Sequence, residues 1–477
     1  MSLLLPILMP LAGALLIGLC GRWPNLREAM SVIAGIATAA SVWALYQAGP
    51  SSLQLTDFGG GLSIYLATEP LGLLFAMVAG GLWPVTAVYA AGYLRGAAEK
   101  HHTRFFIFMA ISIAAAQCIA LAGNLFTLFI GYELLTLATW PLVAHKGDDN
   151  ARKGGRTYLS YLIPSSVALL LPAIIIVQQL AGSTVFSPDG VLAAAELGPI
   201  GLGLLYAMFL FGIGKAALMP LHGWLPAAMV APTPVSALLH AVAVVKAGVF
   251  CVLKVTLYIF GLDTLSAAGA TDPLILIAAF SMIAASLVAL HADNLKRRLA
   301  YSTVSQLAYV SLAAALASSA AAYAGSLQIV MHAFGKITLF FCAGAIYVAH
   351  KKTLVSQLDG LGRQMPLTFI AFTLGAISII GLPPAGGAWT KWWLMLGALD
   401  AGHAWLLGVL ALSTLLNIAY LLPIPLRAFL AGDTPWRWAE APLACLLPLC
   451  LTALVSLWLF FQIPMASALI AITGAQP

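Results

Sequence analysis

Acidic and basic residues stand inside long apolar stretches of this sequence. Glu133 lies in FIGYELLTLATWPL, Lys215 in FGIGKAALMP and Lys246 in LLHAVAVVKAGVF. In apolar surroundings, an amine and a carboxylate change each other's affinity for a proton. A glutamate beside a lysine is therefore a minimal device for taking up and releasing protons, and we predict that Glu133 and Lys215 form such a pair. A purely structural ion pair is the alternative.

Other residues extend this pair into a path. His332 and Lys336 are four residues apart in MHAFGKITLFF, so both project from one helix face and could pass a proton between them. His240 and Lys246 are six residues apart and lie on different faces, so we expect no direct contact. The predicted proton path consists of Glu133, Lys215, Lys246, His332, Lys336 and Lys391.

A second group of polar residues is assigned accessory roles. Lys254 lies two turns beyond Lys246, and we expect its ammonium group to extend to the membrane interface. Two stripes at helical spacing, Ser302 with Ser305, Gln306 and Tyr309, and Ser413 with Asn417 and Tyr420, are typical of contacts between membrane helices. A hydrated path beside these stripes is the alternative. The accessory candidates are His222, His240, Lys254, Ser302, Ser305, Gln306 and Asn417.

The composition is typical of an integral membrane protein, whose surface faces lipid. Of 477 residues, 62% are hydrophobic and 8% charged, whereas about a quarter of a soluble domain is charged. The net charge of +6 is not gathered into a basic run, so nucleic acid is not an expected partner. The cysteines have neither disulfide nor metal-ligand spacing, and motifs for nucleotides, metals, iron–sulfur clusters and haem are absent from the sequence. We therefore predict no cofactor and no catalytic chemistry of its own, only transport driven by an ion gradient or a partner protein.

Charge placement predicts how the chain crosses the membrane. A window of about 20 residues finds apolar segments suited to spanning the bilayer. The fourteen predicted spans start near residues 3, 29, 72, 104, 124, 156, 200, 233, 273, 300, 325, 366, 403 and 440. With the first segment retained as a span and both termini outside, the cytoplasmic loops hold Arg22, Arg27, Arg95, Lys100, Arg104, Lys146, Arg152, Lys153, Arg156, Lys296, Arg297, Arg298, Lys351, Lys352, Arg363, Arg427 and Arg437. The outer loops hold acids instead, as the positive-inside rule requires: Asp57, Glu69, Asp189, Glu196, Asp263, Asp272 and Asp400.

Prolines next to buried lysines predict broken helices. Pro220 and Pro226 follow Lys215, while Pro383 and Pro384 precede Lys391. Interrupted helices mark ion paths in transporters, although a simple proline kink is the alternative. The two breaks fall five spans apart, an odd offset that inverts one unit relative to the other. We predict an all-α membrane fold with an N-terminal three-helix segment (1–103), two inverted five-helix repeats (104–260 and 270–430) and a C-terminal helix (438–477).

Several segments carry a resemblance to a known family. HGWLPAAMVAPTPVSALLHAVAVVKAG, RLAYSTVSQLAYV, HAFGKITLFFCAGAI and GLPPAGGAWTKWW resemble the proton-translocating antiporter-like subunits of respiratory complex I, membrane-bound hydrogenases and Mrp-type sodium/proton antiporters, over roughly residues 70 to 430. The resemblance implies a charge pair of Glu133 and Lys215, a linking Lys246, a central Lys336 and a terminal Lys391 near the outer exit. His332 and His240 match positions where histidine is frequent.

The resemblance also implies a role and partners. The short tail from Met465 to Pro477 disfavours the distal complex I subunit, and the length and lysines are most similar to the Mrp D subunit. We therefore expect a proton-translocating subunit of a cation/proton antiporter in a bacterial-type inner membrane, working with other membrane subunits, lipid, protons and sodium or another monovalent cation. The alternatives are a proton-pumping subunit of a redox complex, which would make the chain part of an enzyme, and the membrane subunit of an inorganic-carbon uptake system.

Overall fold

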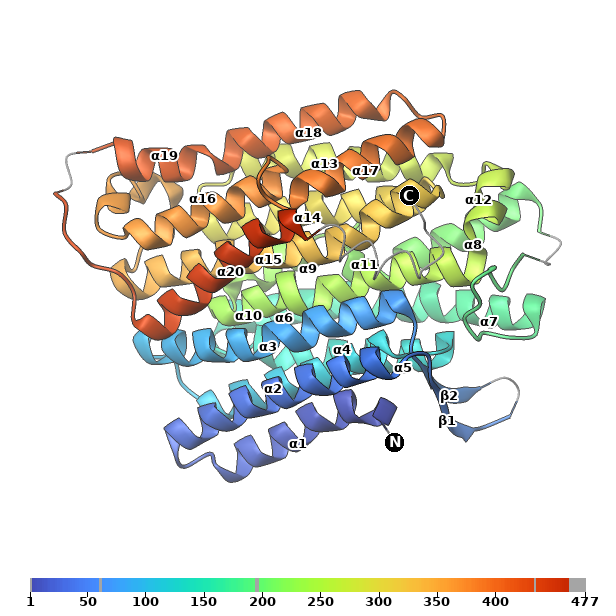
Figure 1. Ribbon diagram of the computed structural model, residues 1–477, viewed down its shortest axis with the longest axis horizontal. Helices are drawn as coiled ribbons and strands as arrows, with labels where there is room; N and C mark the ends of the chain where they lie inside the picture. The colour runs from blue at the N-terminus through green and yellow to red at the C-terminus, as the bar shows by residue number, and fades with distance from the viewer. Residues whose placement is uncertain (1, 60–61, 194–196, 433–434, 463–477) are drawn as a thin grey trace.

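The computed structural model describes residues 2–59, 62–193, 197–432 and 435–462. In these ranges, 11 helices are long and apolar enough to cross a membrane, and two shorter apolar helices span Pro199–Gly212 and Pro366–Ile380. Figure 1 shows the long helices side by side with their axes along the long dimension of the molecule. The expectation of a multi-pass, helical membrane protein is thus confirmed.

The helices and strands follow one another along the chain. In order they are α1 (Leu5–Leu19), α2 (Pro24–Ala48), β1 (Ser52–Asp57), β2 (Ser63–Ala67), α3 (Pro70–Gly96), α4 (His102–Ala120), α5 (Leu125–Val143), α6 (Asp149–Ser165), α7 (Leu171–Ala181), α8 (Pro199–Gly212), α9 (Trp224–Ala227), α10 (Thr233–Ala237), α11 (Val244–Val255), α12 (Leu262–Ala268), α13 (Asp272–His291), α14 (Leu295–Ala315), α15 (Ser319–His350), α16 (Pro366–Ile380), α17 (Gly387–Asp400), α18 (Leu406–Leu421), α19 (Pro423–Leu430) and α20 (Leu443–Phe461). Short π-helical turns join α6 to α7 and α10 to α11, and a further π-helical turn, Thr256–Phe260, continues α11.

Fourteen spans were predicted, but only 11 helices of the described residues are long and apolar enough to count as candidate spans. Helix α14 carries the polar stripe of Ser302, Ser305 and Gln306 and is not among the 11 candidate spans. The two helices with prolines beside lysines are each divided into shorter pieces. The fourteen-span topology, with its inverted repeats, therefore stays a prediction.

Both predicted helix breaks are present. Helix α8 ends at Gly212, and Lys215 follows in a 3-10 turn, Gly214–Ala216, before Ala217 takes a left-handed φ of 52°. Helix α16 ends at Ile380, where Gly381 has a φ of 82°, and α17 begins at Gly387 and carries Lys391. A proline inside a helix removes a backbone donor and clashes with the preceding turn. The breaks leave each lysine next to irregular backbone.

A small hairpin departs from the all-α prediction. Strands β1 and β2 pair antiparallel, and β2 also meets the turn between α4 and α5: the amide of Ala67 donates to the carbonyl of Leu121, and that of Gly123 donates to Tyr65. The hairpin lies at one end of the bundle (Figure 1). The predicted loop between the second and third spans is therefore ordered by main-chain pairing, which replaces water as the partner of its backbone polar groups.

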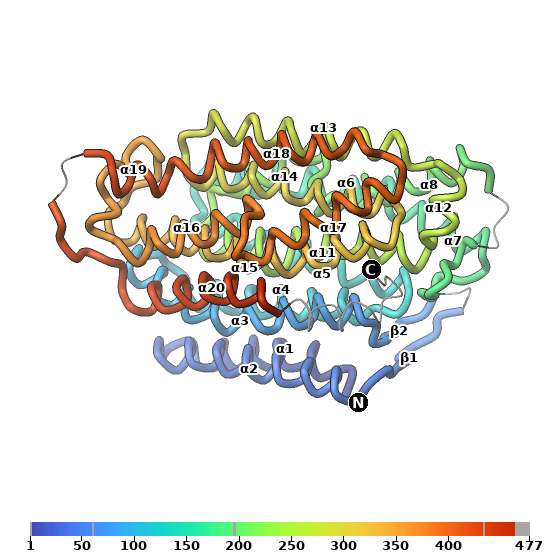
Figure 2. Tube along the Cα trace, turned by 45° about the horizontal axis from the view of Figure 1, so that its top comes forward, coloured from blue at the N-terminus to red at the C-terminus, as the bar shows by residue number. Residues whose placement is uncertain are grey.

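Two helical segments are enclosed by the rest of the bundle. One is Thr233–Phe260, which contains α11, and the other is Ser319–His350, which is α15. In the most apolar 18 residues of each segment, all are buried in the first and 89% are buried in the second. Figure 2 shows α11 and α15 inside the molecule, with α1 and α2 on one side and α13 and α18 on the other. Lysines on α11 and α15 are therefore surrounded by protein, which is where ionisable residues of membrane proteins are tolerated.

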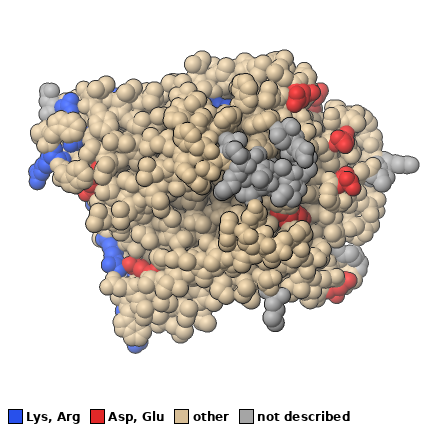
Figure 3. All heavy atoms as spheres, in the orientation of Figure 1, with Lys and Arg blue, Asp and Glu red and all other residues tan. Residues whose placement is uncertain are grey.

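Side-chain caps and charge distribution define the ends of the bundle. Asn124, Asp148 and Asn294 accept hydrogen bonds from the first turns of α5, α6 and α14, as residues with short polar side chains do at helix starts. In Figure 3, lysine and arginine gather at one end, here called the basic end, and most visible acids lie at the opposite, acidic end. This matches the charge separation in the sequence, while the side of the membrane that each end faces stays a prediction.

Candidate functional site

Lys215 is held against α5 by neutral oxygen atoms. Its ammonium nitrogen donates to the carbonyl of Tyr132 at 2.9 Å and to the hydroxyl of Thr136 at 2.5 Å, and it lies 3.1 Å from the centre of the Tyr132 ring. The main-chain amide of Lys215 donates to the hydroxyl of Tyr132. Lys215 is fully buried. The break after α8 thus seats this lysine on one turn of α5.

Glu133 lies on the same turn but does not touch Lys215. No ion pair within 4.0 Å joins the two residues, although Glu133 is close enough to act on Lys215 electrostatically. One carboxylate oxygen of Glu133 is buried and has no hydrogen-bonding partner among the described residues. Glu133 and Lys215 are therefore neighbours without direct contact, and whether they work as a charge pair stays a prediction.

Lys246 is joined directly to His332. Its side-chain nitrogen lies 2.8 Å from His332 Nδ1 and 3.4 Å from the carbonyl oxygen of Gln328. Both Lys246 and His332 are buried, and His332 Nε2 has no hydrogen-bonding partner within the described ranges. The sequence placed both residues on the path but did not pair them, because they lie on different helices.

Lys336 is the next residue of the predicted proton path and lies one helical turn after His332 on α15. Its ammonium nitrogen donates to Ser302 Oγ at 2.6 Å and to the carbonyl of Leu299 at 3.3 Å. Ser302 also accepts a hydrogen bond from the hydroxyl of Tyr420 at 2.9 Å, and Tyr420 in turn contacts Asn417. The polar stripes of α14 and α18 therefore meet at this lysine.

Lys391, the last residue of the predicted proton path, lies in the second broken helix. Its ammonium nitrogen donates to Thr414 Oγ1 at 2.7 Å and lies 5.2 Å from the centre of the Tyr309 ring. The hydroxyl of Tyr309 donates to Ser413 at 2.9 Å. A cavity of about 580 Å³, lined mainly by apolar groups such as Trp389 and Trp392, adjoins Lys391.

The remaining accessory candidates divide into two groups. Ser305 accepts from Ser286 at 2.9 Å, and Gln306 accepts from Gln328 at 2.8 Å, so both join neighbouring helices next to the line of lysines. His240 is fully buried, and its ring lies tilted against Phe340. In the part of the chain that the structure describes, neither ring nitrogen has a hydrogen-bonding partner, so His240 has no hydrogen bond to Lys246, as expected.

His222 lies away from these contacts. It is half-buried beside Tyr301, and among the described residues its Nδ1 has no hydrogen-bonding partner. No hydrogen bond between described residues joins it to a lysine of the predicted path.

The expectation for Lys254 was wrong. Its side chain is fully buried, and its ammonium nitrogen lies 3.0 Å from Glu69 Oε2 instead of being exposed. It also donates to the carbonyl of Ala122 at 2.5 Å. The reason is that Glu69, directly before α3, folds back onto α11, which sequence spacing could not indicate.

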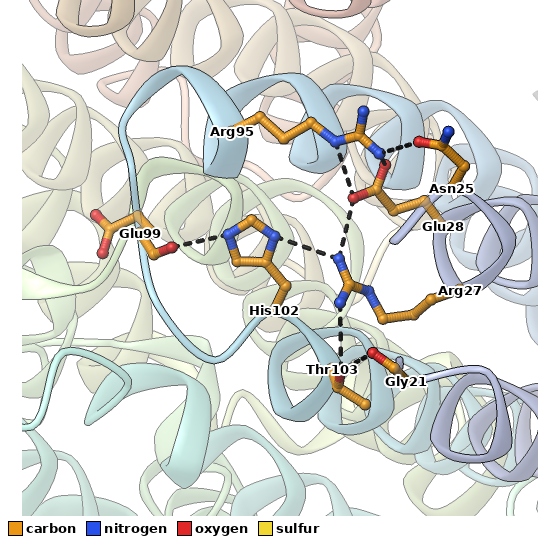
Figure 4. Close-up of polar contacts among 8 residues, drawn as sticks. All are labelled: Gly21, Asn25, Arg27, Glu28, Arg95, Glu99, His102 and Thr103. Carbon is orange, nitrogen blue, oxygen red and sulfur yellow. Dashed lines mark hydrogen bonds and ion pairs between the residues drawn. The ribbon is translucent and has the colours of Figure 1, made fainter. Parts of the chain in front are cut away.

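Sequence reasoning also missed a cluster at the basic end (Figure 4). Glu28 lies between two arginines, 2.6 Å from Arg95 and 3.2 Å from Arg27. Arg27 further contacts His102 at 3.3 Å and Thr103 at 3.3 Å. Arg27, predicted as a loop cation, is buried in the first turn of α2. The cluster fastens α2 to α3 and α4 and does not contact the line of lysines.

The arrangement as a whole suits proton transfer. In the part of the chain that the structure describes, Lys254 is the one lysine buried in the bundle core with a carboxylate within 4.0 Å, while Lys215, Lys246, Lys336 and Lys391 rest on carbonyl, hydroxyl or imidazole groups. Such partners stabilise an ammonium ion without neutralising it. Among the described residues, no group of three or more His, Cys, Asp or Glu side chains could hold a metal ion.

Comparison with known proteins identifies the family. Residues 122–417 match the family described as "NADH:quinone oxidoreductase/Mrp antiporter, TM". The chain belongs to this family. It is 31% identical over 453 residues to NADH-quinone oxidoreductase subunit N of Desulforudis audaxviator (strain MP104C), which covers 92% of this chain and 88% of that relative. The chain is thus an antiporter-like membrane subunit of the kind found in multi-subunit complexes, and the resemblance seen in the sequence is confirmed at the level of this family.

Solved structures show the same fold. A chain of the Mrp complex from Dietzia sp. DQ12-45-1b superposes with a TM-score of 0.85 at 24% identity, covering 99% of this chain and 52% of that one. A chain of the membrane-bound sulfane sulfur reductase (MBS), an archaeal respiratory membrane complex, gives a TM-score of 0.86 at 22% identity, covering 99% and 97%. The fold shared with these two chains therefore extends over almost the whole of this chain.

Proposed function

We propose that this chain is the proton-translocating subunit of a multi-subunit cation/proton antiporter of the Mrp type, which exchanges protons for sodium or another monovalent cation. The observation that carries the proposal is the line of buried lysines that rest on neutral groups: Lys215, Lys246 with His332, Lys336 and Lys391. Placing each lysine in the membrane costs about 2.5–3.5 kcal/mol on insertion scales, so their accumulation indicates use.

Protons would enter at the basic end, pass the line and leave near Lys391. In the open arrangement, Lys215 is held by the carbonyl of Tyr132 and the hydroxyl of Thr136 while Glu133 stands apart. If Glu133 moves toward Lys215, the carboxylate favours the ammonium form, and when it moves away the lysine releases its proton more readily. Movement of Glu133 would therefore switch Lys215 between uptake and release.

The next steps use direct contacts and hydrated gaps. The hydrogen bond between Lys246 and His332 lets one proton reside on either nitrogen, and Lys336 is one turn away on the same face of α15. Tyr309 lies between the polar groups of α18 and Lys391. Water would bridge the remaining gaps, as it does between polar groups too far apart for a direct bond.

The proposed topology has fourteen spans, two inverted five-helix repeats and the basic end in the cytoplasm. Two broken helices, each carrying a lysine, support the repeats, and the charge separation seen in Figure 3 supports the orientation under the positive-inside rule. Proton uptake would then be cytoplasmic.

A second candidate is a proton-pumping subunit of a redox complex. It is favoured by the identity to an NADH-quinone oxidoreductase subunit over 88% of that relative, and by the fold shared with a chain of MBS over 97% of its length. In that case an attached oxidoreductase would drive proton transfer along the same line of lysines.

Partner composition separates the two candidates. The complex is extracted gently from its native membrane by a tag on this chain, and the stoichiometric partners are identified by mass spectrometry. Small hydrophobic subunits without cofactors, together with sodium- or potassium-dependent proton flux in proteoliposomes, are expected. Iron–sulfur or nickel subunits would move the function to the redox complex, and a chain that transports alone would overturn the need for partners.

A further inference from the structure

The acidic end of the bundle contains a buried charge pair that the line of lysines does not use. Lys254 and Glu69 lie 3.0 Å apart, with side-chain exposures of 0% and 15%. Beyond this ion pair, the buried Glu69 Oε2 has no hydrogen-bonding partner among the described residues. A buried ion pair whose carboxylate has no further hydrogen bonds contributes little to the stability of a fold. We therefore looked for a functional role of this pair.

A tyrosine extends the pair. Tyr258 lies four residues after Lys254, in the π-helical turn that continues α11, and so faces the same side. Its side chain is buried, its hydroxyl has no partner among the described residues, and Glu69 acts on it electrostatically. The Tyr258 hydroxyl therefore has no partner among the described residues, while Glu69 Oε2 is contacted there by Lys254 alone.

Three loops hold this site together. Strand β2 and the turn after α4 pair at Leu66 and Ala122, which aims the carbonyl of Ala122 at Lys254. The amide of Phe186 donates to Gly123, and the Phe186 ring lies 4.5 Å from the lysine nitrogen. Carbonyl, carboxylate and aromatic ring together stabilise an ammonium ion.

The site is linked to the surface and to the interior. Glu69 and Thr68 line a cavity of about 100 Å³ together with Tyr46 and Pro50, at the acidic end. On the inner side, Gly248 of α11 packs directly against the main chain of Lys215. Lys254 is six residues after Gly248 on α11, a rise of about 9 Å. Cys251 lies between Gly248 and Lys254 on this helix and interacts electrostatically with both Lys215 and Lys254.

We propose that Glu69, Lys254 and Tyr258 form a second proton-release site, in addition to the exit near Lys391, through which the first half of the chain reaches the solvent at the acidic end. The ammonium of Lys254 gives a proton to the carboxylate of Glu69, leaving an amine and a carboxylic acid. The acid then gives the proton to water in the cavity and returns to the carboxylate. The amine takes the next proton from the interior, on the side of Lys215, so each cycle moves one proton outward. This inference rests on the proposed function.

The test compares matched variants of the intact complex in proteoliposomes, with proton flux read by a pH-sensitive dye. Glu69→Gln keeps the shape but cannot accept the proton. This exit then closes while the one near Lys391 stays open, so we expect flux to fall about two-fold. Tyr258→Phe removes only the hydroxyl without a partner and should lower flux by a smaller factor. Asp263→Asn, which changes an exposed acid at the same end, is the control and should leave flux unchanged.

Glu133→Gln distinguishes failure of this inference from failure of the proposed function. Loss of flux in Glu133→Gln with wild-type flux and pH profile in Glu69→Gln would overturn the release site and leave the function standing. Wild-type flux in both variants would overturn both. Reduced flux in Glu69→Gln that Glu69→Asp restores would support the release site, because a residue that only holds the hairpin in place would not require a titratable group.

A labelling experiment covers the case in which Glu69→Gln does not assemble. Thr68→Cys places a thiol in the wall of the cavity, and a membrane-impermeant maleimide is added from the side that the acidic end faces. We expect labelling of Thr68→Cys to lower flux as much as Glu69→Gln does, while the unsubstituted chain, treated identically, keeps its full flux. Full flux after complete labelling would overturn the proposal.

Discussion

Lys246 Nζ and His332 Nδ1 lie 2.8 Å apart, at the centre of the bundle, although 86 residues separate them in the chain. Both belong to segments that are almost wholly enclosed by protein. Among the described residues, neither side chain contacts a carboxylate. Within that part of the chain, this is the contact at which a lysine and a histidine of the predicted path meet directly.

Replacing His332 tests this contact. We expect His332→Ala to lower proton flux about 100-fold, the typical contribution of a positioned acid–base group, since Lys246 would lose its proton acceptor. Flux is measured in proteoliposomes that contain the intact complex. His291→Ala, at an exposed histidine, is the control and should transport normally. Normal flux in His332→Ala would remove this residue from the path.

Replacing Glu133 or Lys215 tests the first step. We expect Glu133→Ala and Lys215→Ala each to abolish ion exchange while the partners still co-purify, because one side chain without the other cannot switch proton affinity. Leu134→Ala, at the exposed neighbour on α5, should exchange ions normally. Wild-type exchange in either the Glu133 or the Lys215 variant would contradict the mechanism.

Gly248 tests how the first break is positioned. A Cβ atom on Gly248 would lie 2.3 Å from the carbonyl carbon of Lys215 and 2.4 Å from the amide of Ala216, so main-chain atoms would have to move. We expect Gly248→Ala to destabilise the chain by about 1–3 kcal/mol, the usual cost of overpacking, and to displace Lys215 from Thr136.

The measurement for Gly248 combines thermal inactivation of the complex in detergent with proton flux. Gly408→Ala is the matched control, because nothing lies within 4 Å of a Cβ atom there. Equal stability and flux in Gly248→Ala and Gly408→Ala would show that the close packing against Lys215 is not required.

The cluster at the basic end is expected to affect stability and not transport. Glu28→Gln leaves Arg27 and Arg95 without their shared carboxylate, and hydrogen bonds to charged groups contribute about 1.5–3 kcal/mol each. We therefore expect a lower inactivation temperature and unchanged flux per assembled complex. Asp149→Asn, which removes an exposed acid paired with Arg152, should leave both unchanged. A selective loss of flux in Glu28→Gln would connect this cluster to the path.

Much of the organisation could be predicted from the sequence because it depends on local chemistry. Scarce charge and long apolar runs indicated a membrane bundle, prolines beside Lys215 and Lys391 indicated the two breaks, and a spacing of four residues placed His332 and Lys336 on one helix face. Each of these features is determined by the residues next to it along the chain.

Contacts between distant segments were decided by tertiary structure alone. The sequence placed Lys246 and His332 on one path but did not predict their hydrogen bond. It predicted that Glu133 and Lys215 form a pair, but not that Lys215 bonds to Tyr132 and Thr136 instead of contacting the carboxylate. It predicted an exposed Lys254 ammonium, which is buried beside Glu69. Helix periodicity specifies the face on which a side chain lies, but the neighbour of that face depends on how all the helices pack together. Packing therefore decided which of the buried charges lie within reach of one another.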